Sequence, residues 1–383
     1  PQPGCIRTAT DEPHDAVNDG NRRPSVIATR NPIKEGTLMT TDHEQAPTID
    51  DQAKPLKTHV AGYVAHRTIA MGLRTGLIDM FADHPDGLSA EGLADRTGYD
   101  PFYVGVWCRS ALGAGVLARD DGDYRLAPHV DTLLLDQDSP AYIGGVFPVF
   151  EQRELFDRFE EVLPTGERMW WDQTSPEWIA GVSQTGTPFY TRMIPDGLAQ
   201  VPGLTQRLQE GGRIIDTACG VGVGLVRLAS HYPACEIVGV DGDEDSLDLA
   251  DKRVSDAGVS DQVQLKLSPL EEMAIREPAT LVTNNVSMHE CRDIDRVTAN
   301  IKDGLEPGGW FVISDFPFPE DDEGLATVPG RIMAGIQFYE AQIDDQLLPR
   351  SVYDDLLDRH GFSDVDHVEL TPVHALTWGR RPE

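Results

Sequence analysis

The chain has 383 residues, enough for two domains with substantial cores. Its 64 acidic residues against 32 basic ones give a formal charge of -32, which repels phosphate backbones and anionic lipid and disfavours a nucleic-acid partner. The five cysteines form no C-x-x-C pair, and no apolar run reaches about 18 residues, so the sequence predicts neither a disulfide scaffold nor a membrane span. A reducing cytoplasm is the expected location.

Most basic residues are arginines. Lysine occurs only at Lys34, Lys54, Lys57, Lys252, Lys266 and Lys302. An acid-rich, lysine-poor surface suits a halophilic protein in a high-salt cytoplasm, where screening makes self-repulsion tolerable. An ordinary acidic protein from a GC-rich genome is the alternative.

Residues 1–52 are predicted to be a disordered leader. Their stretch "DEPHDAVNDGNRRPSV" is polar and lacks the apolar centre of a secretory signal. Met39 is a candidate for the native start.

Residues 53–138 are predicted to form a winged-helix domain. Apolar residues at helical spacing from Val60 to Met80 predict one long or two short helices. A helix is expected to begin near Ser89, and a second one follows Asp100 as N-cap with Pro101 at its first position. Asp121-Gly122 then signals a β-hairpin. The presumed recognition helix offers only Arg109 as a cation, so we expect a structural or dimer-forming role more than DNA binding.

Residues 139–208 are predicted to be a helical, aromatic linker that contributes to a substrate pocket. Core packing explains most of its aromatic residues. The dense stretch "MWWDQTSPEW" after a Pro/Gly break is the exception. It makes Trp170 and Trp171, together with Tyr190, candidates for an apolar pocket wall.

Residues 209–383 alternate strands and helices. Strands are predicted at 213–217, 236–241, 262–267, 280–286 and 309–315, then a helix at 349–360 and strands near 364–370 and 373–379. This order predicts an α/β fold with a Rossmann-like, doubly wound, mostly parallel seven-stranded sheet, preceded by the mainly helical winged-helix domain. A ligand is expected at the carboxyl ends of the first strands.

The stretch "RIIDTACGVGVGL" (213–225) predicts a strand that runs into a nucleotide-binding turn. Gly220, Gly222 and Gly224 permit a sharp turn and a close ligand. Leu225 stands where a dinucleotide motif needs its third glycine, and no Gly-Lys-Ser/Thr follows for a phosphate loop. Asp216 beside the glycines suits a ligand that carries an ammonium and a sulfonium group better than a pyrophosphate. Asp241, at the end of the next strand, can accept hydrogen bonds from both ribose hydroxyls.

The motif "DTACGVG", with "SMHECRD" after the fourth strand and "LEPGGWFVISD" at the fifth, resembles class I S-adenosylmethionine-dependent methyltransferases of the small-molecule O-methyltransferase-like group. The resemblance covers roughly residues 56–380. It implies S-adenosyl-L-methionine as cofactor, a small-molecule acceptor and a homodimer whose first helices exchange contacts. The residues expected at the cofactor are Asp216, Ala218, Gly220, Gly222, Asp241, Gly242, Ser268, Leu270, Asn284 and Asn285.

Three of these positions depart from the family pattern. Ala218 replaces the usual first glycine and is small enough if its φ stays below zero. Ser268 and Leu270 stand where the family often has an acidic residue against the adenine amine. For Asn284 and Asn285, capping of the strand end is the alternative role, and Asp243 is expected to be solvated.

The resemblance implies a general base at His289-Glu290, where the family often has a His-Asp pair. An imidazole with a pKa near 6.5 is suited to take a proton from a phenol or enol acceptor as methyl transfer proceeds. Glu340 is the candidate group that orients His289, and Met288 is a candidate pocket wall. A helix cap or pocket wall is the alternative role for His289. No metal site is expected, although His289 and His374 can approach each other in such a fold.

The sequence thus favours an S-adenosylmethionine-dependent O-methyltransferase with a catalytic domain at 209–383. Transfer to carbon or nitrogen stays open. A winged-helix transcription regulator that keeps a methyltransferase-like domain is the alternative from another class of protein.

Overall fold

The first described element is a long helix, α1 (Ile49–Arg74), followed by the short α2 (Leu77–Ala82). The computed structural model describes residues 46–169 and 173–383. Helix α1 begins inside the segment 1–52 that the sequence predicts as disordered. Thr48 and Asp51 bond each other's backbone N–H through their side chains, and this capping box explains the early start. The remainder of the predicted leader, including Met39, lies outside the described residues.

Two helices and a β-hairpin follow. They are α3 (Ala90–Thr97), α4 (Pro101–Gly113), β1 (Leu117–Asp120) and β2 (Asp123–Leu126), and then α5 (Val130–Leu134). The side chain of Ser89 caps α3, and the Asp100 carboxylate accepts hydrogen bonds from two backbone amides of α4. These helix starts confirm the sequence-based prediction. The element order is that of the expected winged helix, whose role as a dimerisation domain stays a prediction.

A small apolar core holds this region together. Leu77, Ile78 and Phe81 of α2 pack with Leu93 of α3 and Trp107 of α4, all of them buried. The packing of α2 on the helix pair supplies the apolar burial that such short helices need to be stable in water.

The middle of the described chain contains the helices α6 (Val146–Val149), α7 (Asp157–Val162), α8 (Pro176–Arg192) and α9 (Leu204–Gln209). Helix α8 matters most for the site. Ser175 caps its start, and its last turns carry Tyr190 and Arg192 towards the sheet. Trp170 and Trp171, predicted as pocket walls, lie outside the described residues.

The carboxyl-terminal half forms a seven-stranded sheet of order β5-β4-β3-β6-β7-β9-β8. Its strands are β3 (Gly212–Thr217), β4 (Cys235–Asp241), β5 (Val263–Leu267), β6 (Ala279–Asn285), β7 (Leu305–Asp315), β8 (Ser363–Thr371) and β9 (His374–Arg380). The first five pair in parallel, and β9 pairs antiparallel with both β7 and β8. The predicted strands and the predicted fold class are confirmed.

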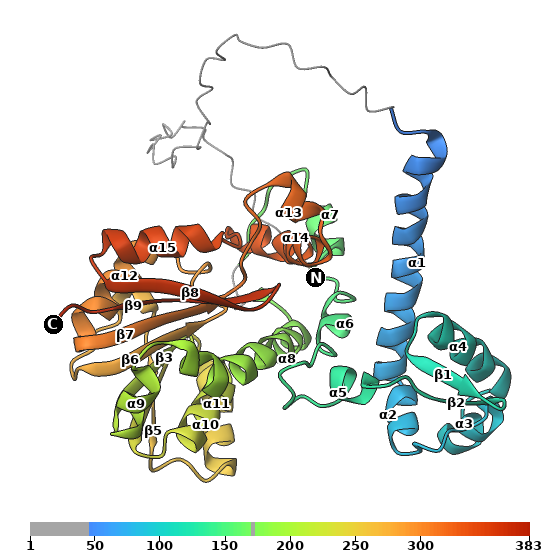
Figure 1. The fold of residues 1–383 in the computed structure, drawn as a ribbon, viewed down its shortest axis with the longest axis horizontal. Helices are drawn as coiled ribbons and strands as arrows, with labels where there is room; N and C mark the ends of the chain where they lie inside the picture. Colours follow the sequence, from blue (N-terminus) through green and yellow to red (C-terminus); the bar gives the residue numbers. More distant parts are fainter. Residues whose placement is uncertain (1–45, 170–172) are drawn as a thin grey trace, which may run out of the picture. The chain divides into compact units, whose positions relative to one another are not determined.

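Helices cover both faces of this sheet (Figure 1). The helices on the sheet include α10 (Val223–His231), α11 (Glu244–Asp256), α12 (Ile294–Gly304) and α15 (Arg350–Arg359). Two further helices, α13 (Asp322–Ala326) and α14 (Val328–Glu340), come between β7 and α15 in the sequence. One apolar core joins α9, α10 and α11 to the sheet, and a second joins α12 and α15 to its other face. Because β3 has β4 on one side and β6 on the other, the chain reverses direction across the sheet there. Ligands of such folds bind at this point, beyond the carboxyl ends of the strands.

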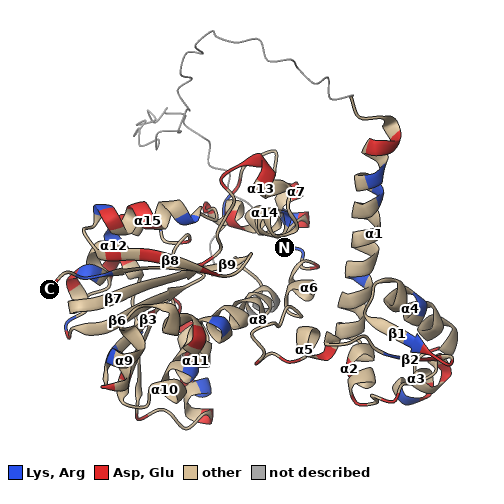
Figure 2. Ribbon diagram, viewed as in Figure 1, with Lys and Arg blue, Asp and Glu red and all other residues tan. Residues whose placement is uncertain are grey.

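Acidic residues are spread over many elements. Figure 2 shows them on β8, α13 and α15, with basic residues at the two ends of α15. No helix in the described ranges combines the length and apolar character that a bilayer span requires.

Candidate active site

The turn between β3 and α10 lies at the switch point of the sheet and has an unusual backbone. Ala218, Gly220 and Gly222 all have positive φ, of 53°, 50° and 80°. The two glycines adopt this conformation without steric cost. The condition that Ala218 keeps φ below zero is therefore not met. An alanine at positive φ costs about 1 kcal/mol, and its methyl group packs against the apolar core under the turn, which offsets part of this cost.

Asp216 lies in the buried part of β3 and is fully enclosed. Its carboxylate accepts hydrogen bonds from the Tyr190 hydroxyl at 3.0 Å and from Thr283 Oγ1 at 2.9 Å. Burial raises the pKa of Asp216 to about 7. Tyr190, predicted to line a substrate pocket, instead lies buried against this carboxylate.

Gly224 is required for close packing and not for the conformation of the turn. Its φ is not positive, and a Cβ built on it would overlap the Tyr190 ring and the Asp216 carboxylate. Leu225 is fully buried in the core. The third glycine therefore allows α10 to approach α8 and β3 closely.

Asp241 links the glycine turn to the next strand. Its carboxylate accepts hydrogen bonds from the backbone N–H of Gly220 at 2.8 Å and of Asp243 at 2.9 Å. Burial raises the pKa of Asp241. Asp243 itself caps α11 by accepting from Ser246 N at 2.8 Å, which gives it a structural role in place of the expected solvation.

The loop after β5 lies beside the same strand end. Ser268 N donates to the carbonyl of Asp241 at 2.8 Å, and Leu270 is buried. Gly242 follows Asp241, and the nearest atoms to a Cβ built on it belong to Ser268 and Pro269. The structure thus brings the predicted ribose and adenine positions together.

Asn284 and Asn285 end β6 and are both buried. Asn284 Nδ2 donates to Thr217 Oγ1 at 3.1 Å, while Asn284 Oδ1 has no hydrogen-bond partner among the described residues. Asn285 Oδ1 accepts from Ser314 Oγ at 2.6 Å, and Ser314 Oγ lies 2.8 Å from His374 Nε2. Asn285 is thus held by a side-chain contact to β7, whereas Asn284 has a buried acceptor oxygen without a donor among the described residues.

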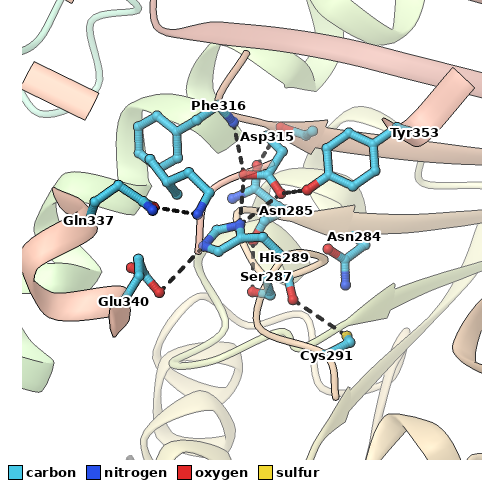
Figure 3. A network of polar contacts seen from close by, with 12 residues as sticks. Asn284, Asn285, Ser287, His289, Cys291, Asp315, Phe316, Gln337, Glu340 and Tyr353 are labelled. Atoms are coloured by element: carbon cyan, nitrogen blue, oxygen red, sulfur yellow. Dashed lines mark hydrogen bonds and ion pairs between the residues drawn. The ribbon is translucent and has the colours of Figure 1, made fainter. Parts of the chain in front are cut away.

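His289 is buried at the centre of a polar network beyond β6 and β7 (Figure 3). Its Nδ1 lies 2.9 and 3.0 Å from the two carboxylate oxygens of Asp315. Asp315 also accepts from Tyr353 Oη at 2.7 Å and from the backbone N–H of Phe316 at 2.8 Å. These bonds fix the imidazole with Nδ1–H towards Asp315. The other nitrogen, Nε2, lies 3.8 Å from Glu340 Oε2.

The segment that carries His289 begins with a strained residue. Val286 has a φ of 54°, which is rare for a β-branched side chain, and its N–H donates to the carbonyl of Ser314 at 2.7 Å. Such strain persists only where the surrounding structure holds it, and it gathers at functional sites.

Three carboxylates act on the charge of His289. Burial alone lowers its pKa, but the charge and hydrogen bond of Asp315, followed by Glu340 and Glu290, raise the pKa of His289 to about 10. Burial raises the pKa of Glu290 and of Glu340, and repulsion from Glu340 raises that of Glu290 further. At neutral pH the structure therefore favours a proton on His289.

The surroundings of His289 differ from the prediction that Glu340 orients it. Glu340 lies where the sequence places it, but Asp315 and Tyr353 make the direct contacts to the network and were not predicted. Asp315 ends the predicted fifth strand in "FVISD", so its place at the carboxyl edge was a usable signal. Tyr353 carries no such signal, because it comes from the otherwise ordinary helix α15.

Two further predictions need correction. Met288 is fully buried in the core shared with α12 and α15 rather than facing a pocket. His374 does not join His289, because its two nitrogens contact Ser314 and Arg192 Nε, the latter at 3.1 Å. Burial and Arg192 lower the pKa of His374 well below its usual range, so it is neutral.

Residues 214–309 match a family model described as methyltransferase domain. This match identifies a methyltransferase domain within the chain. A ubiquinone/menaquinone biosynthesis C-methyltransferase of Geobacter sp. strain M21 is 27% identical to it over 179 residues, 43% of this chain and 76% of that protein. A dTDP-4-amino-2,3,4,6-tetradeoxy-D-glucose N,N-dimethyltransferase of Saccharopolyspora spinosa is 28% identical over 118 residues, 30% of this chain and 44% of that protein. The chain therefore spans less than half of this second relative.

The fold of the methyltransferase chain extends beyond the matched residues. Human N-acetylserotonin methyltransferase in complex with S-adenosylmethionine is similar in structure, with a TM-score of 0.63 and 15% identity, over 90% of this chain and 100% of that one. This similarity establishes the common fold.

Proposed function

We propose that this protein transfers the methyl group of S-adenosylmethionine to an ionisable hydroxyl of a small, largely apolar molecule, with His289 as the general base. The observation that carries this proposal is the buried imidazole at the carboxyl ends of β6 and β7. Its Nδ1 is tied to Asp315, and its Nε2 is turned away from that carboxylate. This is the arrangement that orients a histidine for proton transfer.

The reaction would be an in-line displacement. The acceptor oxygen attacks the sulfonium methyl carbon while His289 Nε2 takes the hydroxyl proton, and the bond from carbon to sulfur breaks to leave neutral S-adenosylhomocysteine. Much of the catalysis comes from holding the acceptor about 3 Å from that methyl group in a dry site. The complete burial of His289 and Asn284 supports a water-poor environment for this step.

The cofactor would lie along the ends of β3, β4 and β6. Asp216, Gly220 and Gly222 are proposed for its methionine part, with Ala218 in the same turn. Asp241, next to Gly242, is proposed for the ribose, and the loop of Ser268 and Leu270 for the adenine. The unpartnered Asn284 Oδ1 supports this placement, since a buried acceptor oxygen suits the cofactor's ammonium group.

Incubation with methyl-labelled S-adenosylmethionine and a panel of phenols and enols tests the reaction. We expect label in the organic product and stoichiometric S-adenosylhomocysteine, and analysis of the product distinguishes oxygen from nitrogen or carbon transfer. Tight binding of NAD in calorimetry without binding of S-adenosylmethionine would overturn the proposal.

A homodimer is proposed from the exposed apolar side of α1. Leu56, Val60 and Tyr63 are each about two-thirds exposed, and Val64 is about half exposed, which is costly for a helix face in water. A second copy is the occupant that the family resemblance implies. Light scattering of the purified chain should give twice the monomer mass. A monomer mass for Val60→Glu together with a dimer mass for the parent chain would assign the interface to α1.

A further inference from the structure

The polar cluster around His289 contains three groups of the kind that hold metal ions. His289, Glu290 and Glu340 each place one ligand atom within 4.8 Å of the others. His289 Nδ1 is engaged by Asp315, so the free ring nitrogen is Nε2, which lies 3.8 Å from Glu340 Oε2. Ligands of a tetrahedral zinc ion at about 2.0–2.2 Å lie about 3.5 Å from one another. Side-chain adjustments well below 1 Å would bring this pair into coordination.

One buried oxygen atom of the cluster, Glu340 Oε2, has no hydrogen-bond donor among the described residues. Glu340 is only 4% exposed, and its Oε2 accepts no hydrogen bond from the described residues although it faces the imidazole (Figure 3). A buried carboxylate oxygen without a donor is costly and calls for a partner. Glu290 adds a second carboxylate beside it, and the two groups repel each other when both are ionised, so a divalent cation at this point would offset their charge better than the single proton on His289.

The surroundings of His289 are those of a metal-binding imidazole. Histidine ligands commonly donate their other ring N–H to a carboxylate, which fixes the ring and makes the ligating nitrogen more basic. Asp315 has this position, and it is itself held by Tyr353 and by the backbone N–H of Phe316. Such support is present before any cation binds.

We propose that His289 Nε2, Glu290 and Glu340 form a binding site for a divalent first-row transition metal. One imidazole and two carboxylates suit zinc, iron, cobalt or manganese better than calcium or magnesium, which bind oxygen ligands. Three protein ligands leave positions open for water or for an acceptor oxygen. The cation and the proton compete for Nε2, so the general-base role of His289 describes the metal-free protein.

Calorimetric titration of the chelator-treated full chain with Zn²⁺, repeated with Co²⁺, tests the site. We expect one tight site, proton release on binding, and a cobalt spectrum without thiolate bands. Glu340→Gln keeps the side-chain shape and should lower the affinity at least 100-fold. Asp315→Asn should lower it about 10- to 100-fold by loss of the supporting bond. Glu369→Gln, the same change at an exposed residue of β8, should leave the affinity unchanged.

Circular dichroism and melting curves confirm that each variant is folded. A parent chain that binds no Zn²⁺ or Co²⁺ overturns the inference, and so does a Glu340→Gln chain that binds as tightly as Glu369→Gln. S-adenosylhomocysteine is titrated into the same samples. Its failure to bind would defeat the proposed function and leave the cation result standing, so the two proposals fail separately.

Discussion

The glycine turn and the His289 cluster differ in how they are built. The turn is shaped by its backbone, which has positive φ at three positions. The carboxylate of Asp241 holds it in place by accepting a hydrogen bond from Gly220 N–H. The His289 cluster works through buried ionisable side chains drawn from the ends of β6 and β7 and from α14 and α15. Changes at the turn are therefore expected to affect cofactor binding, and changes at the cluster are expected to affect turnover.

We expect His289→Ala to give the largest difference between the effect on turnover and the effect on cofactor affinity. Loss of a positioned general base should lower turnover about 100-fold or more, while the affinity for S-adenosylhomocysteine stays nearly unchanged. Turnover is measured with labelled cofactor, and affinity by calorimetry. His231→Ala, at an exposed residue on α10, serves as the control. Normal turnover in His289→Ala would show that His289 only lines the site and does not act as the general base.

Asp241→Asn should give the opposite pattern. The carboxamide has one acceptor oxygen, so it cannot both keep the bonds from the two backbone amides and hold the ribose. Hydrogen bonds to a charged group are worth about 1.5–3 kcal/mol, which predicts about 10- to 100-fold weaker cofactor binding with turnover at saturation little changed. Asp243→Asn preserves the cap of α11 and should bind normally. Equal binding by the two variants would remove Asp241 from the cofactor site.

The smallest effect is expected at Ala218. Glycine adopts the φ of 53° without strain, so Ala218→Gly should raise the free energy of unfolding by up to about 1 kcal/mol. Its cofactor affinity should match that of the parent chain. Denaturant titration measures the change. A clear loss of stability would show that packing of the methyl group outweighs the backbone strain.

The sequence predicted the turn better than the cluster, for a physical reason. Strand periodicity and glycine spacing are local, so β3, β4 and the turn could be placed from the residues between Arg213 and Asp241 alone. The sign of φ at Ala218 could not be predicted from these residues, because it depends on how the turn packs against the apolar core. Tyr190 and Met288 were predicted as pocket walls because they are apolar residues near the motifs, and packing buries both of them.

The contacts within the His289 cluster could not be predicted from local sequence patterns, because they join residues that are far apart in the sequence. Its members lie between His289 and Tyr353 in the sequence and meet only when β7, α14 and α15 are in place. The pKa of His289 is the clearest case, because the side chain alone suggests a value near 6.5 and the enclosing carboxylates raise it to about 10. Periodicity could predict that His289 follows β6, but not which charges surround it.

The pH dependence of turnover tests the acid-base centre most directly, with chelator present and a single acceptor. A raised pKa keeps the proton on His289 at neutral pH, so turnover of the parent chain should rise with pH as the imidazole loses that proton. Asp315→Asn removes the charge that contributes most to raising this pKa, so its turnover should rise at lower pH than that of the parent chain. Coincident profiles for the two proteins, or turnover that falls as pH rises, would contradict the assignment of His289 as the base.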